Sequence, residues 1–214
     1  MTSLMEIRKL ALDLATEGGE PLSELDRALI NLGVRSSVTS LDRPAIAESV
    51  GAAFAAGATP AQIQEILSLV SGLGVHSLMV ACASVVQQAR ANGYQIAETL
   101  TPQQDELWLK YVGDDPFWRA FERELPGFLR SMLLLSPDQF EAFFLYCAVP
   151  WKSGQVRARI KELTAMACDA TPSHRFMPGF RLHLANAIAL GAGHIAIAEV
   201  LDLASAAPDH QGTA

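Results

Sequence analysis

Residues 51–72, GAAFAAGATPAQIQEILSLVSG, and residues 185–206, ANAIALGAGHIAIAEVLDLASA, are two copies of one pattern. Aligned without a gap, they share nine identities in 22 positions, among them Gly57 with Gly191. In each copy a helix ends at a glycine, which adopts the positive φ of a C-cap at no steric cost, and a second amphipathic helix follows. The repeat therefore predicts two matching helix pairs that bury their apolar faces against each other.

Helix starts are marked along the chain by a capping residue followed by proline. The four pairs are Thr59-Pro60, Thr101-Pro102, Asp115-Pro116 and Ser136-Pro137. Proline at the first helical position loses only an N–H that has no partner inside the helix. No stretch alternates apolar and polar residues for long enough to predict a strand. The sequence thus predicts an all-α protein of about ten to twelve helices, at the usual mean helix length.

The charge balance argues against a nucleic-acid partner. The 214 residues include 16 basic and 23 acidic ones, which gives a net charge of −7, and half of the chain is apolar. Such a composition is typical of a compact globular protein. Binding to a phosphate backbone needs clustered positive charge, and no long Lys/Arg run is present.

Two apolar stretches are candidates for targeting or membrane segments. The N-terminal stretch MTSLMEIRKLALDLATEGG contains Glu6 and Asp13 and lacks the uninterrupted core of a signal peptide. Residues 66–89 carry no formal charge and are long enough to span a bilayer. Two glycines interrupt this run, and no basic residue lies between positions 44 and 89 to anchor an end. We expect two buried helices here, no membrane partner and a cytoplasmic protein.

The three cysteines, Cys82, Cys147 and Cys168, are far apart and form no CxxC motif. This spacing excludes a zinc ribbon, a disulfide framework and a dithiol redox centre of the usual kind. We interpret them as buried, reduced thiols.

The middle of the chain differs in composition from the two repeats. Eleven of the fifteen aromatic residues lie between Trp108 and Trp151, several of them three or four positions apart, as on one helix face. This favours an aromatic core; a pocket wall or a subunit contact is the alternative. We predict a first module at 1–98, an aromatic-rich helical connecting segment at 99–150 and a second module at 151–214.

Three segments together resemble the carboxymuconolactone decarboxylase and alkylhydroperoxidase D-like family. They are HLANAIALGA at 183–192, IAEVLDLAS at 197–205 and, in the first copy, AAGATPAQIQEILSLV at 55–70. The chain resembles a tandem fusion of two such helical modules. The resemblance implies an all-helical fold that assembles into homo-oligomers. It also implies either disulfide-linked peroxide chemistry or decarboxylation of a small lactone acid.

The peroxidase branch of that family carries a CxxCxxxH motif. Matching its histidine to His183 places Phe176 and Gly179 at the two cysteine positions. Neither can supply the thiolate that this chemistry needs. Cys168 has no partner cysteine nearby in the sequence, so thiol peroxidase activity is not expected.

The acidic residue that the family carries upstream of the histidine matches Glu162, in KELTAMACDA. A short insertion before His183 brings in a second histidine, His174. In the first module the histidine position is Ser49, and Glu24 is the predicted match for Glu162. The first module is therefore degenerate, and the predicted catalytic residues are His183, His174 and Glu162 of the second.

These residue types suit proton transfer on a small acid. A histidine titrates near neutral pH, and a carboxylate can orient its ring. Residues 156–181 have a local charge excess of +3, within which Arg175 and Arg181 are candidates to bind a substrate carboxylate; a solvated helix surface is the simpler interpretation. Two histidines and a carboxylate could also hold a divalent metal, but no HxH or HExxH spacing supports it. We expect no metal and no cofactor.

Two functions from different classes remain open. The first is a cofactor-free lyase of the decarboxylase type, acting on a small carboxylate or lactone, with His183 and His174 as acid/base groups and Glu162 as the orienting carboxylate. The second is a catalytically silent helical homo-oligomer that binds a small ligand or acts as an assembly module. They differ in whether the three side chains converge in one cavity that admits solvent.

Overall fold

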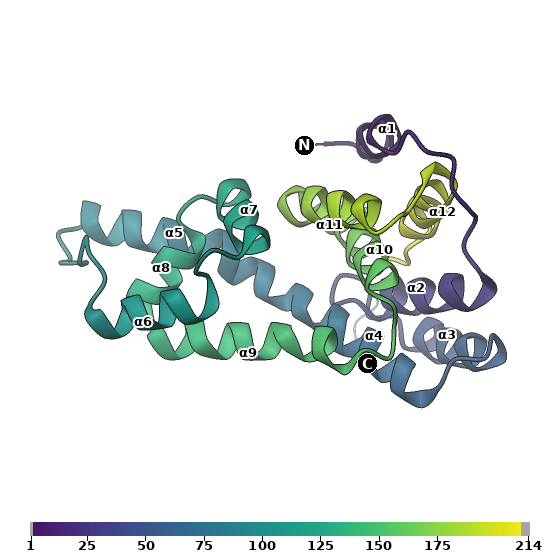
Figure 1. Ribbon diagram of the computed structural model, residues 1–214, viewed down its shortest axis with the longest axis horizontal. Coiled ribbons are helices and arrows are strands. Elements are labelled where there is room, and N and C mark those ends of the chain that lie inside the picture. Colours follow the sequence, from purple (N-terminus) through teal and green to yellow (C-terminus); the bar gives the residue numbers. More distant parts are fainter. Residues whose placement is uncertain (1, 211–214) are drawn as a thin grey trace. The chain divides into compact units, whose positions relative to one another are not determined.

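The computed structural model describes residues 2–210 and is built from helices (Figure 1). These residues form twelve α-helices and one 3₁₀ turn, and no strand occurs among them. The predicted all-α class is confirmed. Contacts divide the chain into two compact units: unit 1 comprises the residues up to 73 and those from 150 onward, and unit 2 comprises residues 74–149.

Unit 1 draws its helices from both ends of the chain. The first group is α1 (Leu4–Leu14), α2 (Glu24–Ser36), α3 (Arg43–Ala55) and α4 (Pro60–Ser71). The second group is α10 (Ala158–Ala170), α11 (Met177–Ala189) and α12 (His194–Ser205).

The two groups repeat helix for helix. The bounds of α2, α3 and α4 differ from those of α10, α11 and α12, respectively, by one constant offset, the one that aligns Gly57 with Gly191. The backbone repeats as well, because φ is +90° at Gly57 and +86° at Gly191, and it is positive at both Leu41 and Arg175. The predicted tandem modules are present, and the repeat also includes the helix that precedes the matching sequence pattern.

Helix α10 lies at the centre of unit 1. Every residue from Ile160 to Ala170 is buried, and α10 contacts α2, α4, α11 and α12. A helix covered on all sides has no solvent-facing stripe, which explains its weak amphipathic pattern. It also carries Lys161, Glu162 and Asp169 into the interior, where charged groups require compensating partners.

Glu65 on α4 provides one of these partners. Its Oε1 accepts hydrogen bonds from the backbone N–H of Val156 at 3.1 Å and from Nζ of Lys161 at 2.8 Å. The backbone N–H of Gln155 donates to Oε2 at 2.8 Å. The last helix of the first repeat thereby holds the segment that leads into α10 of the second.

Glu199 on α12 makes the reciprocal contact. Its Oε2 accepts a hydrogen bond at 2.7 Å from the backbone N–H of Leu22, which precedes α2, and Nη2 of Arg27 lies 2.6 Å from Oε1. All three residues occupy the positions that the repeat aligns with residues of the Glu65 contact. Each repeat thus binds the entry to the other repeat's first helix.

Unit 2 contains the aromatic residues that the sequence places in the middle of the chain. Its helices are α5 (His76–Ala91), α6 (Pro102–Tyr111), α7 (Pro116–Glu124), α8 (Phe128–Leu135) and α9 (Pro137–Ser153), the last of which runs on into unit 1. Phe121, Phe128, Phe140 and Phe143 are at most 3% exposed. The aromatic segment therefore forms a core of its own, as the helical spacing predicts.

The unit boundaries differ from the predicted module boundaries. The predicted first module extends to residue 98, whereas the first segment of unit 1 ends at residue 73. The reason is that α5 packs on α8 and buries Met79, Cys82 and Val86 in unit 2. The two repeats also form one compact unit rather than two, because helices of one repeat pack on helices of the other, as α10 does on α2 and α4.

The predicted helix starts agree with the structure: α4, α6, α7 and α9 each begin at the proline of a predicted pair. Thr59 and Thr101 form full capping boxes with the glutamine three residues later. These short-range signals depend on the local chain alone, which is why the sequence reveals them.

The helical run Pro60–Ala91 is long and apolar enough to cross a membrane by length and composition, with a mean hydropathy of 1.9 in its most apolar window. A third of that window is buried. The predicted break at the glycines is present as the 3₁₀ turn Gly72–Val75, but α5 buries one face only. That this run does not enter a membrane stays a prediction.

Candidate active site on helices α10 and α11

Glu162 on α10 and His183 on α11 are in direct contact. Nδ1 of His183 lies 2.7 Å from Oε2 of Glu162. Asn186, three residues further along α11, donates from Nδ2 to Oε1 of Glu162 at 3.1 Å. Since residues three apart share a helix face, α11 presents both groups to one carboxylate.

This pair is shielded from solvent but not sealed. Glu162 is 6% exposed, and the side chain of His183 is 13% exposed. When Nδ1 donates its hydrogen to a carboxylate, the tautomer is fixed, and Nε2 is the nitrogen that gains or loses a proton. The arrangement therefore suits an acid/base histidine with an orienting carboxylate.

The electrostatic surroundings favour the protonated ring. Burial alone would lower the pKa of His183, but its hydrogen bond to Glu162 and the negative charge of Glu162 raise the pKa above the usual value, and Asp169 raises it further when ionised. The imidazolium is stabilised by the partner that orients it. The raised pKa suits His183 to the role of a general acid.

His174 lies in the loop between α10 and α11 and contacts a different acid. Its Nε2 is 3.6 Å from Oδ1 of Asp169, and its ring stacks on Phe176 with centroids 5.7 Å apart. Burial lowers the pKa of His174. The structure therefore pairs Glu162 with His183 and places His174 beside Asp169, so the three predicted catalytic residues occupy two neighbouring pairs rather than one.

The two arginines predicted to bind substrate occupy different settings. Arg175 is half-buried in the loop with φ of +48°, and its Nε donates to the carbonyl oxygen of Pro172 at 2.9 Å. Arg181 is exposed on α11, two residues before His183. Positions two apart on a helix do not share a face. Substrate binding by either arginine stays a prediction.

The sequence alone does not identify Asn186 and Asp169 as residues of this site. Asn186 stands three positions after His183, which is the helical spacing at which two side chains meet. Asp169 stands seven positions after Glu162, two turns further along the same helix face. These two spacings indicate a shared site only when α10 and α11 are known to pack against each other.

The first repeat lacks the acid/base pair. The positions equivalent to Glu162, His183 and Asn186 hold Ala28, Ser49 and Ala52. Ser49 is buried and donates to the carbonyl oxygen of Ala45 at 2.7 Å. The predicted match of Glu24 with Glu162 is wrong, because Glu24 begins α2 as Ala158 begins α10.

The thiols belong to other surroundings. Phe176 is the N-cap residue of α11, and Gly179 lies in its first turn. Burial raises the pKa of Cys82, of Cys147 to about 11, and of Cys168 strongly. Protonated thiols are poor nucleophiles. That the protein has no thiol peroxidase activity stays a prediction.

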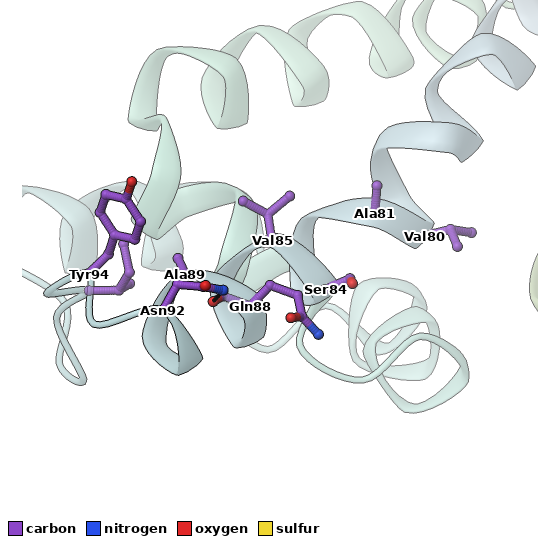
Figure 2. A pocket seen from close by; sticks show the side chains of 9 residues that line it. Val80, Ala81, Ser84, Val85, Gln88, Ala89, Asn92 and Tyr94 are labelled. Carbon is purple, nitrogen blue, oxygen red and sulfur yellow. Dashed lines mark hydrogen bonds between the residues drawn. The ribbon is translucent and has the colours of Figure 1, made fainter.

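Unit 2 carries a shallow groove of about 890 Å³ along α5 (Figure 2). It is lined by Val80, Ala81, Ser84, Val85, Gln88, Ala89, Asn92, Tyr94 and Ile96. Val80 and Val85 are 58% and 49% exposed, and no charged residue occurs from Ser77 to Ala89. The groove therefore offers an apolar contact surface and no acid/base group.

Comparisons with known proteins place the geometry in context. No family model and no curated protein matches the chain. Among solved structures, the chain is similar to a protein from Burkholderia xenovorans LB400 that is provisionally described as a gamma-carboxymuconolactone decarboxylase subunit. The match has a TM-score of 0.73 and 29% sequence identity, and it covers 86% of this chain and 72% of that chain.

Proposed function

This chain belongs to the carboxymuconolactone decarboxylase-like family, and on that premise we propose that it is a cofactor-free lyase that removes CO₂ from a small carboxylic acid or lactone. The observation that carries the proposal is the 2.7 Å contact between Nδ1 of His183 and Oε2 of Glu162. It supplies an oriented, partly exposed acid whose pKa is raised by its bonded carboxylate.

Decarboxylation needs such an acid. When the C–C bond to the carboxylate breaks, CO₂ leaves and the electron pair stays on carbon, where a lactone carbonyl can delocalise it. The imidazolium of His183 then donates its Nε2 proton to that carbon and becomes neutral, and water restores the proton. Glu162 stabilises the imidazolium before the transfer and holds the ring afterwards.

Three further residues are given roles in this proposal. His174, in the loop beside α11, is the second acid/base candidate. Arg175 and Arg181 provide positive charge on either side of the α11 N-terminus, where a substrate carboxylate would be attracted. We also propose that the protein is cytoplasmic and binds neither nucleic acid nor membrane, in line with its net charge of −7.

The test uses γ-carboxymuconolactone, together with a panel of small carboxylic acids and lactones. We expect the wild type to release CO₂ from at least one of them, and the same compound to raise the melting temperature, because a ligand that binds the native state stabilises it. The variant His183→Gln should lose roughly 10²-fold or more in rate, the usual contribution of a general acid.

The first repeat provides the matched control. Ser49→Ala changes the position equivalent to His183 and should leave the rate unchanged. If no compound of the panel stabilises the protein or releases CO₂, the lyase proposal fails. If CO₂ release survives His183→Gln, the proposed acid is wrong.

The α5 groove favours a second candidate function, which is assembly into a homo-oligomer. We propose that the groove binds a second copy of this chain. Its face is apolar and uncharged, so two such faces can meet without the repulsion expected elsewhere on a chain of net charge −7. The similar protein from B. xenovorans is described as a subunit, that is, as part of an assembly.

Light scattering after size exclusion tests this assembly. Val85→Glu places a charge in the groove and should reduce the mass to that of one chain. Gln87→Glu adds the same charge to an exposed position on α5 outside the groove lining and should leave the mass unchanged. A wild type of single-chain mass at micromolar concentration contradicts the proposal.

A further inference from the structure

Asn186 on α11 is a polar residue of the candidate active site to which the proposed reaction gives no role. Its Nδ2 donates to Oε1 of Glu162 at 3.1 Å, while Nδ1 of His183 lies 2.7 Å from Oε2 of the same carboxylate. Both contacts have the length of a hydrogen bond, and all three side chains belong to unit 1. Helix α11 thus binds both oxygens of Glu162, each through a different nitrogen.

The orientation of the Glu162 carboxylate depends on these two contacts. The last torsion of a glutamate side chain, χ3, is broad, so rotamer preference selects no single orientation of the carboxylate plane. One hydrogen bond leaves the plane free to turn about that contact, whereas hydrogen bonds to both oxygens fix it. Glu162 is 6% exposed, so little of it is open to water that could replace a lost donor.

The positions of the hydrogens follow from the chemistry of the carboxylate. An ionised carboxylate accepts hydrogen bonds and donates none. Asn186 must therefore turn its NH₂ group toward Glu162, and the ring nitrogen of His183 that faces Oε2 must carry the hydrogen. In the neutral ring this leaves Nε2 without a hydrogen. The orientation of one carboxylate thus decides which nitrogen of His183 gains or loses a proton.

The first repeat shows that a helix pair of this kind forms without these side chains. Helices α2 and α3 also pack against each other, and the three equivalent positions hold Ala28, Ser49 and Ala52. By contrast, Glu65 and Glu199, which join the repeats, are the same residue in both copies. The acid, the histidine and the amide are present together in one copy and replaced together in the other, as expected for parts of one site.

We propose that Asn186 is a positioning residue of the candidate active site, which orients the carboxylate of Glu162 so that His183 keeps its hydrogen on Nδ1. The amide acts on the histidine through Glu162. In the proposed reaction this arrangement leaves Nε2 as the nitrogen that delivers the proton to carbon. The consequence for catalysis rests on the proposed lyase function, but the effect on the histidine ring does not.

The first experiment compares ¹⁵N-labelled histidine in the wild type and in Asn186→Ala by NMR, above the pH at which the His183 ring becomes neutral. Alanine stands at this position in the first repeat and favours a helix more than asparagine does, so the variant should fold. In the wild type the hydrogen should be on Nδ1, and in the variant the Nδ1 and Nε2 shifts should approach each other as the Nε2–H form is populated. The spectrum of His183→Gln identifies the signals. Asn31→Ala, the same exchange at a half-buried position of α2, is the control and should leave the ring unchanged.

The second experiment tests whether Asn186 acts through Glu162. On a compound that the wild type decarboxylates, Asn186→Ala should lower kcat about tenfold and leave KM unchanged, because it disturbs the partner that orients the acid. In a Glu162→Ala background the same exchange should change kcat by less than about twofold, since the carboxylate that it orients is gone. The tautomer of His183 should likewise not depend on Asn186 in that background. Equal effects in both backgrounds would overturn the action through Glu162.

The outcomes separate this proposal from the proposed function. If His183 has the same tautomer in folded Asn186→Ala as in the wild type, the positioning role is overturned, whether or not the protein releases CO₂. A changed tautomer without lyase activity supports Asn186 and leaves the lyase proposal to fail alone. If the variant does not fold, the wild type decides, because a neutral His183 with its hydrogen on Nε2 contradicts the proposed orientation.

Discussion

Glu65 and Glu199 occupy the same position of two equivalent helices, and each binds the backbone that leads into the other repeat's first helix. The contacts use the same three donor and acceptor positions in both directions. They differ in burial: the Lys161 and Glu65 side chains are 3% and 1% exposed, whereas those of Arg27 and Glu199 are 44% and 23% exposed. The same substitution at the two glutamates should therefore have different costs.

Glu65→Gln should destabilise unit 1 by about 3–5 kcal/mol, because it leaves the buried ammonium group of Lys161 without a charged partner. Glu199→Gln, the matched change in the exposed contact, should cost about 1 kcal/mol or less. Urea unfolding of both variants measures the two costs. Equal costs would show that burial does not distinguish the contacts.

Gly33→Ala should destabilise the protein by about 1–3 kcal/mol through overpacking. A Cβ at Gly33 on α2 would lie 2.4 Å from Cγ2 of the buried Thr164 on α10, so the two central helices would have to separate. Gly51→Ala on α3 meets open space and should be neutral or stabilise by up to about 1 kcal/mol. Thermal unfolding compares the two; equal effects would place the helices further apart than described.

Glu162→Gln should destabilise the protein more in mildly acidic than in alkaline solution. The pKa of His183 is raised in the folded state. The stabilisation that the protonated ring gains from Glu162 is therefore fully present below the pKa of the unfolded state, near 6.5, and is lost as the pH rises through the pKa of the folded state. A hydrogen bond to a charged group contributes about 1.5–3 kcal/mol. Denaturant titrations at pH 5.5 and pH 9 measure the difference, and a pH-independent loss would argue against a protonated His183.

The stability of Asp169→Asn should also improve relative to the wild type as pH rises, but for a different reason. The folded pKa of Asp169, about 8, lies above the ordinary value of 3.8, so the wild type loses stability as pH rises from about 4 to about 8. The asparagine does not ionise, and the variant should therefore gain on the wild type as pH rises. We expect its melting temperature relative to the wild type to be higher at pH 9 than at pH 5 by at least about 3 °C. A constant difference would contradict a proton on Asp169.

The cysteines should resist alkylation in the native protein. Burial raises the pKa of Cys147 to about 11, and Cys82 and Cys168 are shifted in the same direction. Iodoacetamide at pH 7.5 should label all three more than tenfold more slowly than in urea, because the thiolate is the reacting form. Rapid native labelling of Cys168, which mass spectrometry would locate, would contradict its burial.

The sequence predicts the helices well, because their signals are local. The Thr59-Pro60 start and the glycine C-caps at positions 57 and 191 need only the neighbouring residues to act, and the structure contains them all. The gap-free alignment of the two copies correctly predicts the repeated pair of helices. What it does not predict is that α5 belongs with α8, since its uncharged sequence suits a buried helix in either unit.

The sequence predicts part of the candidate site, namely the residues that a sequence pattern specifies. Glu162 and His183 follow from the family pattern, and the structure brings them together. Asn186 and Asp169 complete their surroundings, but their roles depend on how α10 and α11 pack, which no spacing within one helix specifies. The predicted match of Glu24 with Glu162 was wrong. Both are acidic residues near the start of a helix, but the alignment of α2 with α10 places Ala28, not Glu24, at the position equivalent to Glu162.

The reciprocal contacts of Glu65 and Glu199 also impose an order on folding during synthesis. Leu22 and Glu199 are separated by 177 residues, so at about 5–20 residues per second the partner of Leu22 emerges roughly 9 to 35 s later. Residues 74–149 emerge in this interval with their aromatic core complete. We therefore expect unit 2 to fold on the ribosome while the apolar faces of α2, α3 and α4 are still exposed. Until α10 has been synthesised, the nascent first repeat should be a substrate for chaperones.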